Sequence, residues 1–410
     1  MSNTAECRIC GGTVEEFFDF GRQPLSDAFV APGADPAKEF FFRLAVGLCG
    51  SCTMVQLMEE VPREAMFHEE YPYHSSGSVV MRGHFEDLAK QLMATELTGD
   101  DPFAVEMGCN DGIMLKTLAD SGIRHLGVEP SGGVADVAAA KGVRVRKSFF
   151  EEATAREILA EDGPADVIYA ANTLCHIPYM DSILDGVKAL LKPTGVFVFE
   201  DPYLGEIVRR TSFDQIYDEH FYFFTLRSVQ EMAQRHGLEL VDAQRLDVHG
   251  GEVRYTLAHA GARTPSDAVR ELLAEEAAAG LAERATLEAF GAKVLKIKED
   301  LLALLRKAKE EGKRVVAYGA TAKSATVANL CGLGPDLVEF VCDTTPAKQN
   351  RLTPGTHIPV KPAAAFSDPY PDYALLFAWN HAEEIMAKEQ AFRDAGGQWI
   401  LYVPTVRLVP

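Results

Sequence analysis

Residues 103–112 have the sequence FAVEMGCNDG, in which a largely apolar stretch leads into a glycine-rich turn. The stretch Phe103–Met107 is typical of a buried strand, and glycine lets the following backbone approach a ligand closely. A helical pattern begins after the turn, so the first amide groups of that helix would point toward a bound ligand. We therefore predict a strand, a ligand-binding turn and a helix in this region.

Similar apolar stretches alternate with helical patterns on both sides of this turn. Strands are predicted at residues 125–128, 143–146, 167–170 and 195–199. Such alternation is typical of an α/β fold with a doubly wound sheet. A second alternation follows, with strands predicted at 314–318, 337–342, 373–377 and 399–403. The chain is therefore predicted to contain two α/β domains.

The chain divides into four predicted parts. Residues 1–70 form a module bracketed by cysteines, and residues 71–265 form the first α/β domain. Residues 266–310 are rich in Ala and Glu, have helical periodicity and contain no proline, which predicts a helical connector. Residues 311–410 form the second α/β domain.

Composition excludes several classes of function. The 410 residues include 60 acidic and 40 basic side chains, giving a formal net charge of −20, and no basic run interrupts this balance. Such a chain repels phosphate backbones and anionic bilayers, so we expect neither a nucleic-acid partner nor a membrane. No apolar stretch approaches the ~18 residues of a membrane span, and the first residues lack signal-peptide features. We expect a cytoplasmic protein with reduced thiols, and a monomer as the simplest state.

Two C-x-x-C pairs, Cys7 with Cys10 and Cys49 with Cys52, bracket the N-terminal module. Each pair can present two thiolates from a tight turn, and together they suit a tetrahedral Zn²⁺ site. Two unrelated cysteine pairs are the alternative, whereas a redox motif is disfavoured because no βαβ pattern surrounds either pair. Four cysteines leave no open coordination position, so we predict a structural zinc.

The acidic residue Glu129 follows the strand at 125–128, where a carboxylate would meet ribose hydroxyls. The E-x-G-x-x-x-G spacing of Glu106, Gly108 and Gly112 differs from the G-x-G-x-x-G of a dinucleotide site. Together these features resemble the class I S-adenosylmethionine-dependent methyltransferases, although the turn could simply pack a helix on a strand. The predicted cofactor-binding residues are Glu106, Gly108, Asn110, Gly112, Glu129, Pro130, Ser148, Phe149 and Asn172.

Two polar clusters follow later strands. His176 comes after the strand at 167–170, where ligands of open α/β sheets bind, although a lone histidine is often structural. Tyr217, Glu219 and His220 lie in one short segment flanked by aromatic residues. These three supply a proton acceptor, a group to orient it and a phenol donor. The flanking aromatic residues favour a partly buried cleft over an exposed turn.

Further candidates are spread along the chain. Tyr71 lies in YPYHSSGS, which could be a linker or a lid over the cleft. The turn GATAKS, with Lys323, lacks the full phosphate-loop pattern but could offer amides to an anion, or could only pack. The predicted substrate-binding residues are Asp201, Tyr203, Tyr222, Arg254, Lys323, Asn380 and His381.

Nine short sequence blocks occur in a fixed order along the chain and together are typical of one enzyme family. The C-x-x-C pairs are followed in order by QPLSDAF, YPYHSSGS, VEMGCNDG, NTLCHIP, FEDPYLGE, SFDQIYDEHFYFF, HGGEVRYT and YGATAKSA. This order resembles that of the TDP-deoxysugar C-methyltransferases, most closely the carbon-3 enzyme type of tetronitrose biosynthesis. The resemblance implies a zinc-binding N-terminal domain, a class I methyltransferase domain and a C-terminal Rossmann-like domain. It also implies S-adenosylmethionine as cofactor and a TDP-linked 4-keto-deoxysugar, with a 3-amino group, as substrate. By the family's motifs it assigns catalytic roles to His176, Tyr217, Glu219, His220 and the lid tyrosine Tyr71.

A 4-keto group makes the neighbouring carbon-3 proton removable, because the developing charge spreads onto oxygen as an enolate. We expect His220, supported by Glu219, to remove this proton, while Tyr217, His176 or Tyr71 hydrogen-bonds the enolate oxygen. Glu219 or a tyrosine remains the alternative base. A zinc-ribbon RNA methyltransferase is disfavoured by the charge, and an NAD-dependent sugar-nucleotide oxidoreductase by the missing dinucleotide fingerprint.

Overall fold

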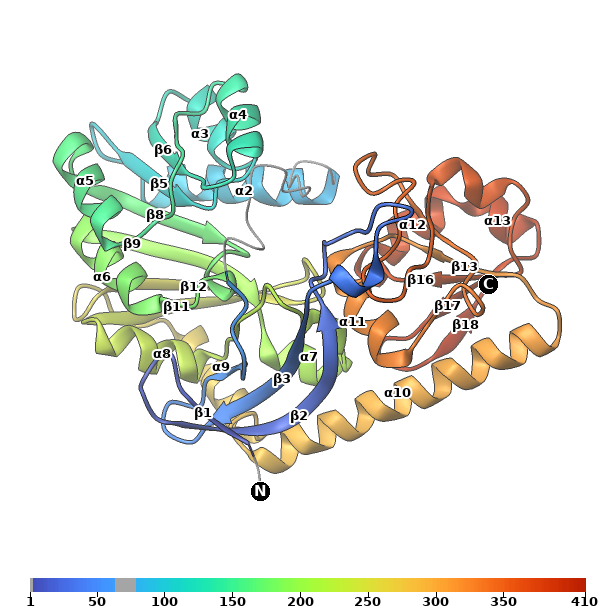
Figure 1. Cartoon of the computed structure of the whole chain (residues 1–410). Helices are drawn as coiled ribbons and strands as arrows, with labels where there is room; N and C mark the ends of the chain where they lie inside the picture. The colour runs from blue at the N-terminus through green and yellow to red at the C-terminus, as the bar shows by residue number, and fades with distance from the viewer. Residues whose placement is uncertain (1–2, 63–78) are drawn as a thin grey trace.

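The computed structural model describes residues 3–62 and 79–410 (Figure 1). Tyr71 and the other residues of YPYHSSGS lie outside the described residues. Within the described part of the chain, no helix is both long and apolar enough to cross a membrane. The strands described there form three sheets, which correspond in order to the N-terminal module and the two α/β domains.

The N-terminal sheet is antiparallel and has the order β1-β2-β3-β4-β10. Its strands are β1 (Thr4–Glu6), β2 (Thr13–Pro24), β3 (Phe41–Cys49), β4 (Val55–Leu57) and β10 (Tyr222–Phe223). A short 3₁₀ helix, η1 (Pro36–Lys38), interrupts the long β2–β3 connection. The last strand comes from the middle of the chain, with Tyr222 opposite Gln56. The first α/β domain therefore completes the sheet of the N-terminal module.

The middle sheet has the order β11-β12-β9-β8-β5-β6-β7, and the strand predicted at Phe103–Met107 is its central, fully buried β5. β6 (Arg124–Val128), β7 (Val145–Arg146), β8 (Ala165–Ala171) and β9 (Leu191–Pro202) run parallel to it. Two antiparallel strands that the sequence did not reveal, β11 (Leu238–Leu246) and β12 (Glu252–His259), extend the other edge.

Helices cover both faces of this sheet, as predicted for a doubly wound fold (Figure 1). On β8, Val167 and Tyr169 pack into one apolar cluster, and Ile168 and Ala170 into another, because successive strand residues point to opposite faces. The helices are α2 (Val79–Thr95), α3 (Leu115–Asp120), α4 (Gly132–Ala140), α5 (Glu152–Asp162), α6 (Met180–Leu190), α7 (Leu204–Arg210) and α8 (Leu226–Arg235). The predicted catalytic residue His176 ends a 3₁₀ helix after β8, η3 (Leu174–His176), whereas Tyr217, Glu219 and His220 lie in the loop between a second 3₁₀ helix, η4 (Phe213–Gln215), and β10.

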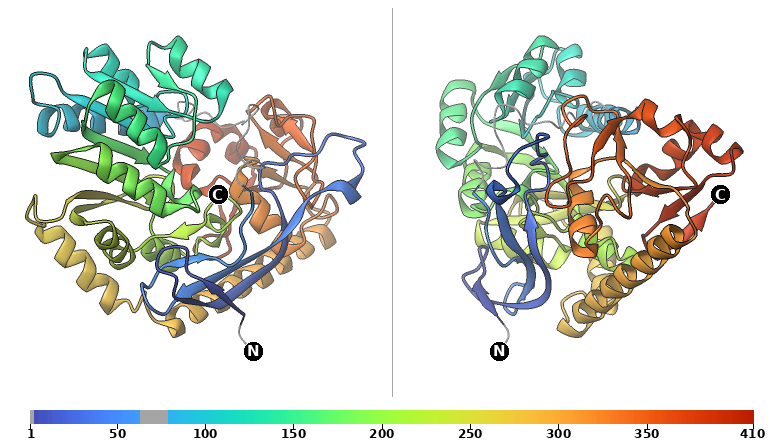
Figure 2. Two further views of the ribbon diagram at one scale, coloured as in Figure 1. Left: turned by 60° about the vertical axis from the view of Figure 1, so that its left-hand side comes forward. Right: turned by 45° about the vertical axis from the view of Figure 1, so that its right-hand side comes forward.

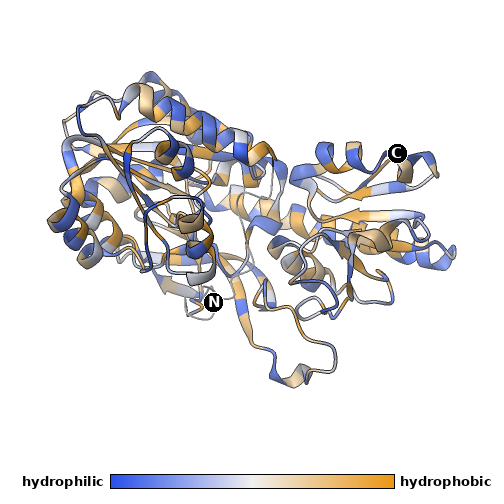
Figure 3. Ribbon diagram, turned by 90° about the horizontal axis from the view of Figure 1, so that it is seen from above, coloured by the Kyte–Doolittle hydropathy of each residue, from blue (hydrophilic) through white to orange (hydrophobic). Residues whose placement is uncertain are grey.

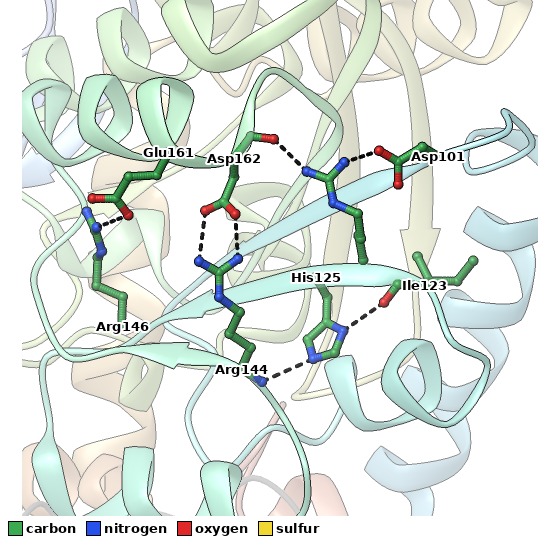
Figure 4. A network of polar contacts seen from close by, with 8 residues as sticks. Asp101, Ile123, His125, Arg144, Arg146, Glu161 and Asp162 are labelled. Carbon is green, nitrogen blue, oxygen red and sulfur yellow. Dashed lines mark hydrogen bonds and ion pairs between the residues drawn. The ribbon is translucent and has the colours of Figure 1, made fainter.

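An exposed network of ion pairs ties the β7 edge to the end of α5 (Figure 4). Arg144 contacts both carboxylate oxygens of Asp162 at 2.6 and 3.0 Å, and Arg146 reaches Glu161 at 2.6 Å. The Asp162 hydrogen bonds raise the pKa of Arg144 above its usual value. Exposed pairs each contribute about 0–1 kcal/mol, so this network mainly fixes the position of the short edge strand.

The C-terminal sheet has the order β15-β14-β13-β16-β17-β18, parallel except for the last strand. Its strands are β13 (Val315–Tyr318), β14 (Val341–Asp343), β15 (Val360–Pro362), β16 (Tyr373–Leu376), β17 (Gln398–Leu401) and β18 (Arg407–Val409). Its helices are α11 (Ala322–Cys331), α12 (Ala382–Lys388) and α13 (Gln390–Asp394), with η5 (Ala363–Ser367) and η6 (Trp379–His381) between strands. This parallel sheet with a helix after β13 confirms the second predicted α/β assembly.

The segment predicted to be a helical connector holds the helices α9 (Asp267–Ala278) and α10 (Arg284–Glu310). The long helix α10 runs from the side of the N-terminal sheet to the C-terminal domain (Figure 2). It packs closely on β2, since a Cβ atom at Gly291 would lie only 2.5 Å from the Phe18 ring. Apolar residues concentrate on the strands and polar residues on the outward helix faces (Figure 3).

Candidate functional site

The four predicted zinc ligands lie together at one end of the N-terminal sheet. Their Sγ atoms all lie within 4.8 Å of one another, and the Cys7–Cys52 and Cys10–Cys49 separations are 3.5 Å. The Gly12 amide donates to Cys10 Sγ and the Ser51 amide donates to Cys49 Sγ, both at 3.4 Å. Sulfurs bound tetrahedrally at ~2.3 Å from zinc lie roughly 3.8 Å apart, so this set fits a closed structural Zn²⁺ site.

A cavity of about 380 Å³ lies where the carboxyl ends of the middle and C-terminal sheets face each other. Its walls come from all three parts of the chain, including Asp27 of the N-terminal module. Thirteen predicted site residues line it: Gly108, Asn110, Glu129, Pro130, Phe149, Asn172, His176, Tyr217, Glu219, His220, Lys323, Asn380 and His381. Residues that are far apart in the sequence therefore form one chamber.

The turn after β5 and the carboxylate of Glu129 form one side of the chamber. Glu129 accepts hydrogen bonds from the backbone amides of Asn110 at 3.0 Å and Ser131 at 2.8 Å. Burial raises the pKa of Glu129, and these amides partly oppose that rise. Gly108 has φ +63°, and a Cβ there would lie 2.5 Å from the Thr173 hydroxyl oxygen, so only glycine fits this turn. This geometry suits the adenosyl ribose of a methyl donor at a strand end.

The opposite wall carries a histidine pair. The ring of His220 stacks on that of His176 with 5.1 Å between centroids. His220 Nδ1 lies 2.7 Å from the Gln215 carbonyl oxygen, which can only accept, so Nδ1 carries the proton. Nε2 is then left as an acceptor for the Tyr217 hydroxyl at 2.9 Å. The structure thus presents a basic nitrogen and a phenol side by side.

Burial decides the charge of this pair. It lowers the pKa of His176 to about 3 and that of His220 well below its usual value. Burial also raises the pKa of the Tyr217 phenol. Both imidazoles are therefore neutral near pH 7, which is the form able to accept a proton. Glu219 also lines the cavity. It is not the hydrogen-bond partner of either ring nitrogen of His220, since these contact Gln215 and Tyr217.

The C-terminal side repeats the arrangement of Glu129. Asp343, at the end of β14, accepts hydrogen bonds from the amides of Ala320 and Thr345, both at 2.7 Å. Nearby, the half-buried Lys323 donates to the His249 carbonyl oxygen at 3.3 Å. Lys348 pairs with Asp27 at 3.2 Å and so links the N-terminal module to this wall.

Seven predicted site residues do not line the cavity. Glu106, in β5, and Gly112, in the turn that follows it, lie within the protein, and burial raises the pKa of Glu106 well above its usual value. Arg254 instead pairs with Glu200 at 2.6 Å and lines a separate cavity of about 320 Å³. The other four are Ser148, Asp201, Tyr203 and Tyr222. For example, the Tyr222 hydroxyl donates to the Pro178 carbonyl at 2.8 Å, a contact within the fold.

The cavity residues that the sequence did not point to include several polar and charged side chains, among them Asp27, Gln215, His249, Asp343 and Lys348. Asp343 carried a usable signal, because it ends the strand after a glycine turn, as Glu129 does. His249 precedes two glycines with positive φ, a hint of a tight functional loop. Gln215 and Lys348 carried no local signal, since their roles depend on contacts between segments distant in the sequence.

The fold and this chamber define a class I S-adenosylmethionine-dependent methyltransferase that carries a zinc module. Three family models match the chain in order: a zinc binding domain at residues 7–67, a methyltransferase domain at 83–243 and a C-methyltransferase C-terminal domain at 247–404. The C-methyltransferase NovU of Streptomyces niveus is 34% identical over 409 residues, covering 98% of this chain and 96% of that protein. The chain therefore belongs to the C-methyltransferase family, and it is an S-adenosylmethionine-dependent C-methyltransferase.

Three further similar proteins each cover less than half of this chain. The sterol 4-C-methyltransferase strm-1 of Caenorhabditis elegans is 26% identical, covering 28% of this chain and 34% of that protein. Among solved structures, the CcbJ methyltransferase of Streptomyces caelestis is 19% identical, with a TM-score of 0.35, covering 43% of this chain and 90% of CcbJ. The magnesium protoporphyrin IX methyltransferase of Synechocystis PCC 6803 is 12% identical, with a TM-score of 0.31, covering 43% and 79%.

Proposed function

We propose that the enzyme methylates carbon 3 of a TDP-linked 4-keto-deoxysugar, of the 3-amino-2,3,6-trideoxy class, in antibiotic deoxysugar biosynthesis. One observation carries the proposal: a single chamber joins the Glu129 turn, the neutral His220–Tyr217 pair and the Asp343–Lys323 wall. A donor, a base and an anchor for a nucleotide are what carbon methylation of a nucleotide-linked keto sugar requires. Membership of the C-methyltransferase family favours this function over an RNA methyltransferase or an oxidoreductase.

The donor side is assigned to the turn after β5. Bound S-adenosylmethionine supplies an electrophilic methyl group. The residues proposed to hold it are Gly108, Asn110, Glu129, Pro130, Phe149 and Asn172, all on the cavity wall. Glu129 is fixed by two backbone amides, so its free lone pairs would meet the ribose hydroxyls without reorganisation.

The base is assigned to His220. Its Nε2 would take the carbon-3 proton and leave the C–H electron pair in the enolate. The enolate would then form the bond to the methyl carbon as that carbon's bond to the donor sulfur breaks, with the electron pair of the broken bond remaining on sulfur. The Tyr217 hydroxyl, which contacts Nε2 in this structure, then donates to the enolate oxygen. Neutral His176, stacked against the base, is a second group beside the reacting atoms. These interactions strengthen only as charge develops along the reaction path.

The nucleotide is assigned to the C-terminal wall. Asp343 has the position and the amide contacts of Glu129, and so suits the sugar hydroxyl of a nucleoside. Burial lowers the pKa of Lys323, while Asp214 and Glu252 oppose that shift, so a bound diphosphate would add further support for its charge. Asn380 and His381 lie on the same wall. Local donors of this kind let a chain with net charge −20 accept a diphosphate.

The direct test incubates the enzyme with S-adenosylmethionine and a TDP-4-keto-2,6-dideoxy sugar carrying a 3-amino or 3-hydroxy group. We expect a product heavier by one methylene unit, with the new methyl on carbon 3 by NMR. The corresponding free sugar, lacking TDP, serves as the control and should react poorly. No mass gain with either TDP-sugar would refute the proposal.

The pH dependence of the reaction follows from the buried imidazole. The active form of His220 is neutral, and its pKa lies below the usual value of about 6.5. Activity should therefore persist as pH falls to 6.5, and decline only at lower pH when Nε2 becomes protonated. The measurement is kcat/KM between pH 5 and 8 with the 3-hydroxy acceptor. An acidic limb centred above pH 7 would contradict this assignment.

A further inference from the structure

The segment that carries the base is held by the C-terminal domain at one buried carboxylate. Asp214, in η4, is fully buried. Its Oδ2 accepts hydrogen bonds from Trp379 Nε1 at 2.6 Å and from the Tyr402 hydroxyl at 2.7 Å. Both donors belong to the C-terminal domain, in η6 and after β17 respectively. Burial raises the pKa of Asp214, and the nearby Lys323 and these two hydrogen bonds oppose that rise.

Gln215, the residue after Asp214, orients the ring of His220. The Gln215 carbonyl accepts the Nδ1 proton of His220, and the Gln215 side chain donates to the His249 carbonyl at 2.5 Å. In many enzymes a carboxylate side chain orients the catalytic histidine, whereas a backbone carbonyl does so here. The ring is therefore placed only as accurately as the backbone of residues 212–220.

Several other contacts clamp this backbone to the C-terminal domain. Thr326, on α11, donates to the Ile216 carbonyl at 2.8 Å. Gly250 has φ +95°, and a Cβ there would lie 2.7 Å from the Trp379 ring and 2.8 Å from Gln215 Nε2. The packing around Trp379 and Gln215 thus tolerates only glycine at this position.

We propose that Asp214 is a positioning residue: bound by Trp379 and Tyr402, it fixes the backbone from which the Gln215 carbonyl aims His220 at the substrate. This inference rests on the proposed role of His220 as base. Trp379 directly precedes Asn380 and His381 on the cavity wall, so the clamp also connects the base to the proposed nucleotide side. Docking of the C-terminal domain becomes a requirement for proton removal, in addition to any role in binding.

The test separates proton removal from methyl transfer. Exchange of the carbon-3 proton is followed by NMR in D₂O, with S-adenosylhomocysteine in the donor site and a TDP-4-keto sugar as acceptor. For Asp214→Ala we expect exchange and kcat to fall together by about 10- to 100-fold, with the Kd of both ligands within threefold. Tyr402→Phe and Trp379→Phe each keep an aromatic ring and remove one hydrogen-bond donor to Asp214. They should give smaller losses of exchange and kcat. They keep the proposal testable if Asp214→Ala does not fold.

Glu39→Gln is the matched control. Glu39 also links another part of the chain to the C-terminal domain, through the Gly355 amide at 2.9 Å, but it does not line the cavity. Its exchange rate should stay within twofold of wild type. The positioning role would be overturned if the wild type exchanges the carbon-3 proton and the folded Tyr402→Phe and Trp379→Phe variants exchange it equally fast. It would also be overturned if the variants lose only ligand binding. Absence of both exchange and methylation in the wild type would instead refute the proposed function.

Discussion

Replacing His220 with asparagine is expected to lower kcat by about 10²–10⁴-fold, which is the usual contribution of a general base. Asparagine keeps a polar group of similar reach but has no nitrogen lone pair that can accept a proton. The side chain is buried and its ring contacts Tyr217, so some loss from repositioned Tyr217 is included in this range. The Kd of S-adenosylmethionine and of the TDP-sugar should change little, because the groups proposed to hold the two ligands lie elsewhere on the cavity wall.

The measurement is single-turnover methylation followed by mass spectrometry, with calorimetry for both ligands. His236→Asn is the control, since His236 contacts Asp185 at 2.8 Å and does not line the cavity. It should behave as wild type. Near-normal turnover in His220→Asn would show that Glu219 or a tyrosine is the base.

Replacing Cys49 with serine is expected to abolish zinc binding and, with it, most activity. Structural zinc contributes about 10–16 kcal/mol to the folding of small zinc peptides, so losing one thiolate ligand should destabilise the module by several kcal/mol. The damage should reach the active site, because β4 pairs with β10. Phe221, next to His220, links both regions: its carbonyl accepts the Leu57 amide at 3.0 Å, and its amide donates to the Cys175 carbonyl at 2.7 Å.

The test measures zinc per chain by elemental analysis, thermal unfolding and kcat. Cys342→Ser is the matched control, since Cys342 is a buried cysteine outside the four-sulfur cluster. It should retain one zinc per chain and show at most a modest loss of stability. A folded Cys49→Ser protein with full zinc content would contradict the assignment of the metal site.

Some features could be read from local sequence because their determinants are adjacent in the chain. The C-x-x-C spacing places two sulfurs on one turn, and the glycine turn after Phe103–Met107 needs only its own residues to form. The central strand was therefore placed at its observed bounds. The strand predicted at 143–146 shortens to Val145–Arg146, because an edge strand depends on its neighbour for pairing.

Other features depended on contacts between distant segments. The antiparallel pair β11–β12 extends the middle sheet only because β9 offers an open edge to β12. Arg254 was predicted to bind the substrate, but β12 directs it to the buried Glu200. No local pattern predicts that partner, because the two residues are far apart in sequence.

Local sequence was enough to identify the four clustered cysteines, the glycine turn with Glu129, and the occurrence of Tyr217, Glu219 and His220 in one segment. The rest depended on the tertiary structure: it stacked His176 on the buried His220 and desolvated both rings, which keeps them neutral, and it placed Gln215 to fix the proton on Nδ1. The physical reason is that residue type and spacing set which atoms are available. Burial and long-range packing set their charge, their orientation and the ligands they can reach.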